Sequence, residues 1–81
     1  MNAKSINRGK QLKFAREYRG YTQSELCRKV KSISQPNLSR YEKGFEGVLE
    51  KGKVEKIMSF LNFPLSFLEV RLPECYNSNN L

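Results

Sequence analysis

The chain has 81 residues, enough for one small domain, and a domain of this size buries only about 60% of the surface of its unfolded chain. It contains 15 Lys and Arg and eight acidic residues, all of them glutamate, and it has no histidine or aspartate. Most of the usual catalytic and metal-binding groups are therefore missing, and we expect neither an enzyme nor a metal or other cofactor.

The net positive charge lies entirely in the first half of the chain. Residues 1–43 carry a net charge of +8, whereas residues 44–81 carry −1. A basic face of this kind attracts polyanions such as nucleic acid or an anionic membrane surface. From composition alone, a solvated face that only aids solubility is an equally good interpretation.

The two cysteines, Cys27 and Cys75, fit no CxxC spacing, so the sequence predicts neither a zinc site nor a disulfide framework. No apolar run approaches the length of a membrane span, and the N-terminal residues lack the apolar core of a signal peptide. We therefore expect a cytoplasmic protein with no membrane association.

The hydrophobic pattern is helical throughout, which predicts an all-α fold. The first helix is expected from about Ser5 to Arg19, with Leu12 and Arg16 on its inner face, and Gly20 is suited to end it.

The second helix begins in the stretch "YTQSEL". The Thr22 hydroxyl and the Glu25 carboxylate have the spacing of a capping box, and Tyr21 and Leu26 that of a hydrophobic staple. Its inner face is expected to hold Leu26, Cys27 and Val30.

The stretch "ISQPNL" repeats this pattern twelve residues later. Ser34 is expected to cap a third helix, with Ile33 and Leu38 as its staple. Pro36 falls in the first turn, where its missing amide hydrogen is tolerated.

A fourth helix is expected in "LEKGKVEKIMSFLN", and Pro64 starts a short fifth helix with Leu65, Leu68 and Phe67 on its inner side. We expect a domain over residues 1–72 and a polar, disordered tail over residues 73–81. The apolar positions of the fourth helix are Val54, Ile57, Met58 and Leu61.

The third helix has a narrow apolar side, with Leu38 and Tyr41, and a polar opposite side. Arginine and glutamine on such a face suit the major groove of DNA, where they bind guanine and adenine. Taken alone, an ordinary exposed helix face is the more frequent explanation. The short turn "KSI" between two capped helices favours a helix-turn-helix instead. The polar side holds Gln35, Pro36, Ser39, Arg40 and Lys43.

The stretches "AREYRGYTQSELCRKV", "ISQPNLSRYEKG" and "VEKIMSFLNFPLSFLE" resemble the Cro/C1-type, or xenobiotic-response-element, family of helix-turn-helix DNA-binding domains over about residues 8–70. The resemblance implies a compact five-helix bundle of the phage-repressor type, with helices 2 and 3 as the helix-turn-helix. It also implies a homodimer on palindromic operators in double-stranded DNA.

The resemblance also implies roles for individual residues. Thr22, Gln23 and Lys43 are expected to contact DNA phosphates, with Gln23 also bracing the recognition helix. Arg16 and Glu42 match a mostly buried ion pair that joins the first helix to the third. Base edges or neighbouring phosphates are expected to be contacted by Gln35, Pro36, Asn37, Ser39 and Arg40.

The sequence departs from the family pattern at three places. Lys31 and Ser32 stand where a single glycine is usual, so the turn is one residue longer. Cys27 replaces the usual alanine, and we interpret it as a packed thiol rather than a redox switch. Glu46 cannot bind phosphate where relatives often carry basic residues, and the neighbouring Phe45 is expected to be a core or dimer-contact residue.

The leading hypothesis is a transcriptional repressor that binds an inverted repeat as a homodimer. The alternative is an antitoxin-like or regulatory interaction module that holds a protein partner or a C-terminal domain outside this chain, through apolar residues such as Phe60 and Phe63. "AREYRG" and "LNFPLSFLE" resemble regulators that continue into a zinc metallopeptidase, but the HExxH motif of that enzyme needs histidines that this chain lacks.

Overall fold

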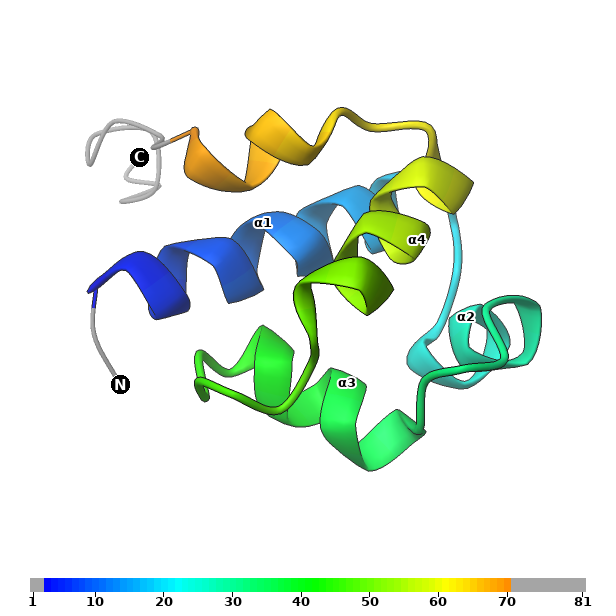
Figure 1. Ribbon diagram of the computed structural model, residues 1–81. Coiled ribbons are helices and arrows are strands. Elements are labelled where there is room, and N and C mark those ends of the chain that lie inside the picture. Colours follow the sequence, from blue (N-terminus) through cyan, green and yellow to red (C-terminus); the bar gives the residue numbers. More distant parts are fainter. Residues whose placement is uncertain (1–2, 71–81) are drawn as a thin grey trace, which may run out of the picture.

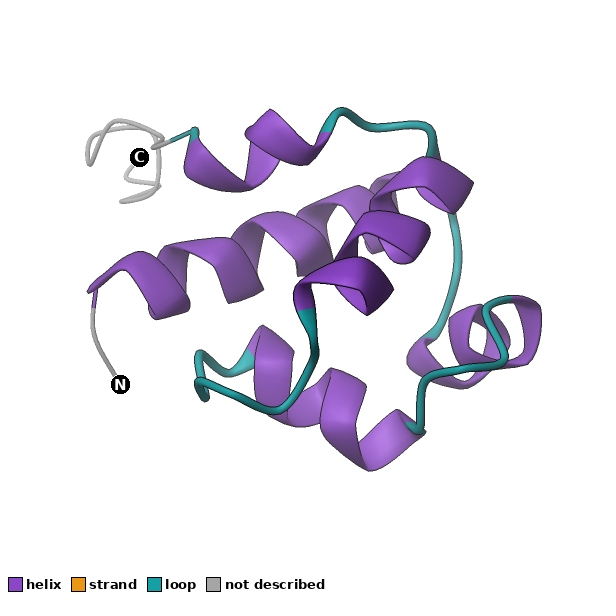
Figure 2. Ribbon diagram, viewed as in Figure 1, coloured by secondary structure: helices purple, strands orange, loops and turns teal. Residues whose placement is uncertain are grey.

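The computed structural model describes residues 3–70, and this part of the chain is helical and contains no strand (Figures 1 and 2). The all-α class is confirmed. Among residues 3–70, none of the helices combines the length and apolar character that crossing a bilayer requires. The tail expected at 73–81 lies outside the described residues. The elements are α1 (Ala3–Tyr18), α2 (Gln23–Lys29), α3 (Gln35–Glu42), α4 (Lys51–Leu61) and the 3-10 helix η1 (Leu65–Glu69).

The short fifth helix expected after Pro64 is observed, and it is the 3-10 helix η1. It begins after Pro64 and has five residues, a length at which 3-10 geometry is common. The expected five-helix bundle is therefore not confirmed in full: residues 3–70 form four α-helices and one 3-10 helix.

Helix α1 lies at the centre of the arrangement (Figure 1). It packs against η1 and α3 and also contacts α4, while α2 packs against α3. Helix α3 is thus held by both α1 and α2.

The core lies between these helices and contains most of the apolar residues expected on their inner sides, whereas Tyr41, Leu65 and Phe67 are only partly buried and pack against it. Cys27 is half-buried and packs against this core. Phe45 is 45% exposed, so it is not a core residue. The buried cluster consists of Leu12, Ala15, Leu26, Val30, Ile33, Leu38, Val54, Ile57, Met58, Leu61 and Leu68.

Gly20 ends α1, as the sequence predicted. Gly20 has a φ of +84°, and the next amide, that of Tyr21, donates to the Arg16 carbonyl at 3.1 Å. A left-handed residue followed by such a bond is a common helix C-terminus, and glycine adopts it without steric cost.

Helices α1 and α3 approach each other closely at Gly9, which is buried inside α1. A β-carbon built there would lie 2.7 Å from the Glu42 carbonyl oxygen and would also collide with that of Tyr41. Only glycine therefore allows the backbone of α3 to come this near to α1.

The 3-10 helix η1 is held to α1 by polar side chains. Asn7 Nδ2 donates to the Leu68 carbonyl at 3.2 Å, and Gln11 Nε2 donates to the Phe67 carbonyl at 3.3 Å. Arg8 adds an ion pair to Glu69 at 2.9 Å. The Asn7 bond thus gives the Leu68 carbonyl a donor near the end of η1, while the Phe67 carbonyl also accepts the Val70 amide hydrogen at 3.2 Å.

Candidate nucleic-acid interface

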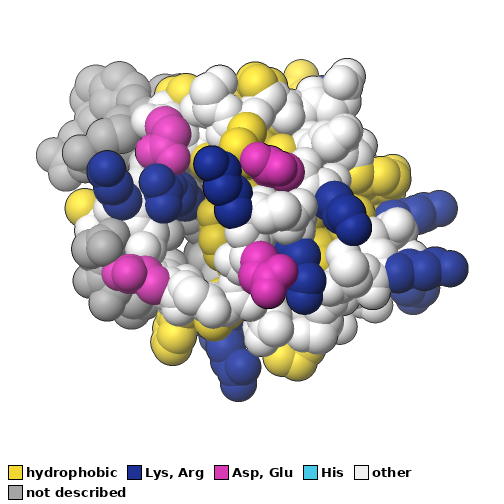
Figure 3. All heavy atoms as spheres, viewed as in Figure 1, with side chains coloured by type: hydrophobic (Ala, Val, Ile, Leu, Met, Phe, Trp, Pro, Cys, Tyr) yellow, Lys and Arg dark blue, Asp and Glu magenta, His cyan; other side chains and the backbone are white. Residues whose placement is uncertain are grey.

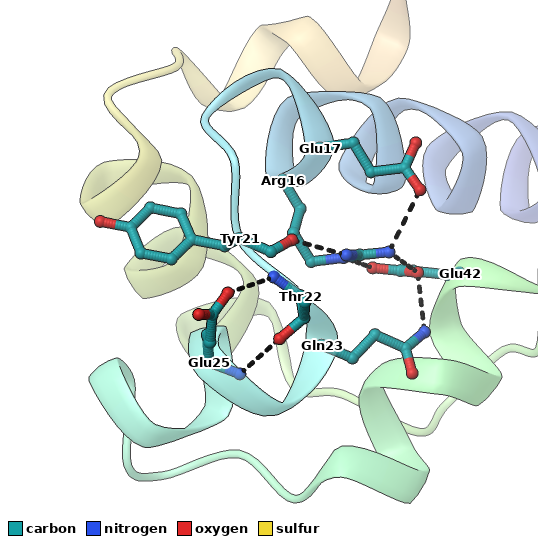
Figure 4. Close-up of polar contacts among 7 residues, drawn as sticks. All are labelled: Arg16, Glu17, Tyr21, Thr22, Gln23, Glu25 and Glu42. Carbon is teal, nitrogen blue, oxygen red and sulfur yellow. Dashed lines mark hydrogen bonds and ion pairs between the residues drawn. The ribbon is translucent and has the colours of Figure 1, made fainter.

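The start of α2 carries the capping box that the sequence predicted (Figure 4). Thr22 Oγ1 accepts the Glu25 amide hydrogen at 3.1 Å, and Glu25 Oε1 accepts the Thr22 amide hydrogen at 2.9 Å. The bond from the Thr22 amide lowers the pKa of the Glu25 carboxyl, because it stabilises the charged form. The first turn of α2 is thus rigidly defined.

The start of α3 is capped by Ser34, whose Oγ accepts the Asn37 amide hydrogen at 3.4 Å. Pro36 lies in the first turn, as expected. Because this bond is long and α3 has no reciprocal carboxylate, the cap of α3 is weaker than that of α2.

Helix α3 presents the polar face that the sequence predicted. Leu38 and Glu42 are buried and Tyr41 is half-buried. The opposite side is open to solvent, although Asn37 and Ser39 are partly covered. Its exposed side chains are Gln35, Pro36, Arg40 and Lys43.

On its buried side, α3 is joined to α1 by the ion pair between Arg16 of α1 and Glu42 of α3 (Figure 4). Arg16 Nε donates to Glu42 Oε2 at 2.7 Å and Nη2 donates to Oε1 at 3.0 Å, while Nη1 donates to the Tyr21 carbonyl at 2.7 Å. The bond to Glu42 raises the pKa of Arg16. One guanidinium therefore fixes α3 and the segment entering α2 at the same time.

Gln23 connects α2 to this ion pair. Its Nε2 donates to Glu42 Oε1 at 2.9 Å, so the same carboxylate oxygen accepts bonds from Arg16 and Gln23. The bracing of α3 by Gln23 is thereby observed. Together with Thr22 and Gln35, Gln23 lines one open hollow on the surface. The first turns of α2 and α3 are therefore neighbours on one polar surface.

The other predicted site residues lie farther along α3. Arg40 and Lys43 are exposed and do not line the hollow that holds Thr22, Gln23 and Gln35. Of the predicted site residues, the structure thus brings Thr22, Gln23 and Gln35 together in one hollow and leaves the exposed Arg40 and Lys43 outside it.

Two residues that sequence reasoning missed position this surface. Gly9 sets the distance between α1 and α3. A glycine inside an otherwise helical segment could have indicated such a close approach from the sequence. Arg19 donates from Nε to the Leu61 carbonyl at 2.7 Å and lies 4.7 Å from the Phe63 ring centre, which ties α1 to the end of α4. The partners of Arg19 are more than 40 residues away in the chain, so no local sequence pattern predicts these contacts.

The thiol of Cys27 has no catalytic setting. Burial raises its pKa, which favours the unreactive protonated form, and the chain has no histidine to act as its base. Among the described residues, no group of three or more His, Cys, Asp or Glu side chains is arranged to hold a metal ion.

The fold and this surface define a small, basic, all-helical domain with two short capped helices whose first turns meet. The model of the helix-turn-helix family, of the Cro/C1 type, matches residues 12–68. The chain therefore belongs to this family of DNA-binding regulators, which are generally not enzymes. Comparisons with curated proteins and with solved structures gave no match. The resemblance to metallopeptidase-fused regulators stays a prediction.

Proposed function

We propose that the chain is a cytoplasmic, sequence-specific transcriptional repressor that binds an inverted-repeat operator in double-stranded DNA as a homodimer. Residues 1–72 are its DNA-binding domain, α2 and α3 are the helix-turn-helix, and α3 is the recognition helix. The observation that carries this proposal is the exposed polar face of α3, which is held beside the start of α2 by the buried bonds among Arg16, Gln23 and Glu42.

Helix α3 supplies the groups that read bases. A solvent-exposed arginine at position 40 suits bidentate binding to guanine, and Gln35 suits adenine, with each good pair discriminating by about 1–3 kcal/mol. Because the apolar side of α3 is buried, the helix can enter the groove in one rotational setting only. The proposed base-contacting residues are Gln35, Pro36, Asn37, Ser39 and Arg40.

Thr22, Gln23 and Lys43 supply the phosphate contacts. The amide nitrogen of Gln23 carries two hydrogens, and one of them bonds to Glu42. The second remains for a phosphate oxygen, so one side chain can both brace α3 and set its depth in the groove. Contacts of this kind position the protein without reading sequence.

The experiment is a selection from random DNA duplexes at moderate salt, followed by sedimentation of the selected complex. An enriched inverted repeat bound by two protomers, with half-sites about 34 Å apart, supports the proposal. A selection that enriches no sequence refutes it. Transcription from a promoter that carries the selected repeat then tests repression, which should fall when the repeat is scrambled.

A second candidate function is favoured by aromatic residues on the surface. Phe14 and Tyr18 of α1 are exposed, and their rings contact Phe67 and Phe63. Phe60 is exposed on α4. Such a surface suits an interaction module that holds a partner protein or an attached domain. A stable heterocomplex that covers these rings, together with no enriched DNA sequence, would favour this function over the first.

A further inference from the structure

A second basic surface lies beside the turn that joins α2 to α3. An open hollow of about 580 Å³ is formed there by the end of α2, the turn and the outer side of α4. Its lining residues are Lys29, Val30, Lys31, Ser32, Lys56, Ser59 and Phe60.

The charge in this hollow is all of one sign. Three lysines line it, no glutamate does, and all three lysines are exposed. None of the ion pairs that the structure contains between residues 3 and 70 involves Lys29, Lys31 or Lys56. At the end where α2 lies, Lys and Arg side chains project from the molecule (Figure 3). Gathering like charges is unfavourable in the free protein, so a polyanion seated here would relieve the repulsion.

A purely structural explanation covers only one of the three lysines. Lys29 is in the last turn of α2, where a positive charge is favourable beside the negative end of the helix dipole. Lys31 belongs to the turn and Lys56 to the middle of α4, so neither is placed to have that effect. The helix dipole therefore does not explain why Lys31 and Lys56 line the same hollow as the hydroxyls of Ser32 and Ser59.

The hollow is close to the start of α3. Lys31 precedes Gln35, the first residue of α3, by four residues, so their Cα atoms are at most about 14 Å apart. DNA carries a phosphate every 3.4 Å or so along each strand. An extended lysine beside a helix that occupies the major groove therefore lies within a few phosphates of the base pairs read by that helix.

We propose that Lys29, Lys31 and Lys56 form a second phosphate-binding surface, which contacts the DNA backbone next to the base pairs at the N-terminal end of α3. This inference rests on the proposed function, because it takes α3 as the recognition helix. The lysines add affinity and salt dependence but read no sequence, since they offer only ammonium donors to phosphate oxygens.

The test compares two triple variants on the duplex obtained by selection. Lys29→Gln/Lys31→Gln/Lys56→Gln removes the proposed surface, and Lys10→Gln/Lys13→Gln/Lys51→Gln removes the same charge at exposed positions outside the hollow. Binding is measured over a range of salt concentrations. We expect the slope of log affinity against log salt to become shallower by about 2.7 per bound protomer in the first variant, because each phosphate contact contributes about 0.9. We expect a smaller change in the control.

The selected sequence should be the same for the first variant and the wild type. The proposal would be overturned if the first variant still unfolded cooperatively but kept the wild-type salt slope. It would also be overturned if the control variant showed an equal decrease in slope. Failure of the proposed function would be seen separately, as a wild-type protein that selects no sequence. In that case the slopes measured on a random-sequence duplex still decide whether the three lysines contact phosphate.

Discussion

Arg16 and Glu42 join α1 to the last turn of α3 through two parallel hydrogen bonds, with only 7% and 3% of their side chains exposed. Because the pair is desolvated, removing one partner leaves an unpaired buried charge. We expect Glu42→Ala to lower the free energy of unfolding by about 3–5 kcal/mol in a urea titration.

The matched control is the double variant Arg16→Met/Glu42→Leu, which fills the site with apolar groups. It should be less destabilised than Glu42→Ala, because it leaves no stranded charge. If the double variant loses as much stability as the single one, shape rather than charge explains the cost.

Gln23 and Arg40 should differ in their effect on DNA binding. Arg40→Ala removes a proposed base contact, so it should relax preference at one position of the operator and lower affinity for the best sequence by about 1–3 kcal/mol. Gln23→Ala removes a proposed phosphate contact and a bond to Glu42, so it should weaken all sequences alike. Titrations against the selected operator and single-base variants measure both effects, and position-specific loss for Gln23→Ala would contradict its assignment.

Replacing the two helical glycines, Gly9 and Gly52, by alanine should have opposite effects on the stability of the protein. Gly9→Ala places a methyl group against backbone carbonyls of α3, and overpacking of this kind costs about 1–3 kcal/mol. Gly52→Ala in α4 meets nothing within 4 Å and should stabilise the protein by about 0.5–1 kcal/mol. Urea unfolding of both variants measures the difference, and a neutral Gly9→Ala would contradict the close approach of α1 and α3.

The capping box of α2 predicts a pH dependence of stability. The pKa of Glu25 is lower in the folded protein than its ordinary value of 4.5, because its carboxylate accepts the Thr22 amide hydrogen. This stabilisation is fully present above the unfolded-state pKa and is lost as the pH falls through the folded-state value. The difference in Tm between wild type and Glu25→Gln should therefore shrink between about pH 5 and pH 3.

Thr22 offers the controls for this pH dependence. Thr22→Ser keeps the hydroxyl cap and should keep the wild-type profile, whereas Thr22→Ala should lose about 1 kcal/mol of stability at neutral pH. A difference in Tm between wild type and Glu25→Gln that is constant over the whole pH range would show that the carboxylate does not contribute through its charge.

The two helix starts show what sequence reasoning can achieve. Thr22 and Ser34 were predicted as caps and are observed as caps, because a cap depends on residues within three positions of each other. The buried sides of α3 and α4 were predicted for the same reason, since helical periodicity places them on one face. The short helix after Pro64 was predicted without its type, because its five residues are too few for periodicity to distinguish an α-helix from a 3-10 helix.

By itself, the sequence determined the helices, the caps of α2 and α3, the apolar sides and the polar face of α3, all of which follow from local spacing. The tertiary structure decided how close α1 comes to α3 at Gly9 and which carboxylate Gln23 binds. It also decided that Lys56 of α4 lines the same hollow as Lys29 of α2 and Lys31 of the turn. These relationships join residues 19 to 33 positions apart. They depend on how whole helices pack, and a local pattern of residue types contains no information about that packing.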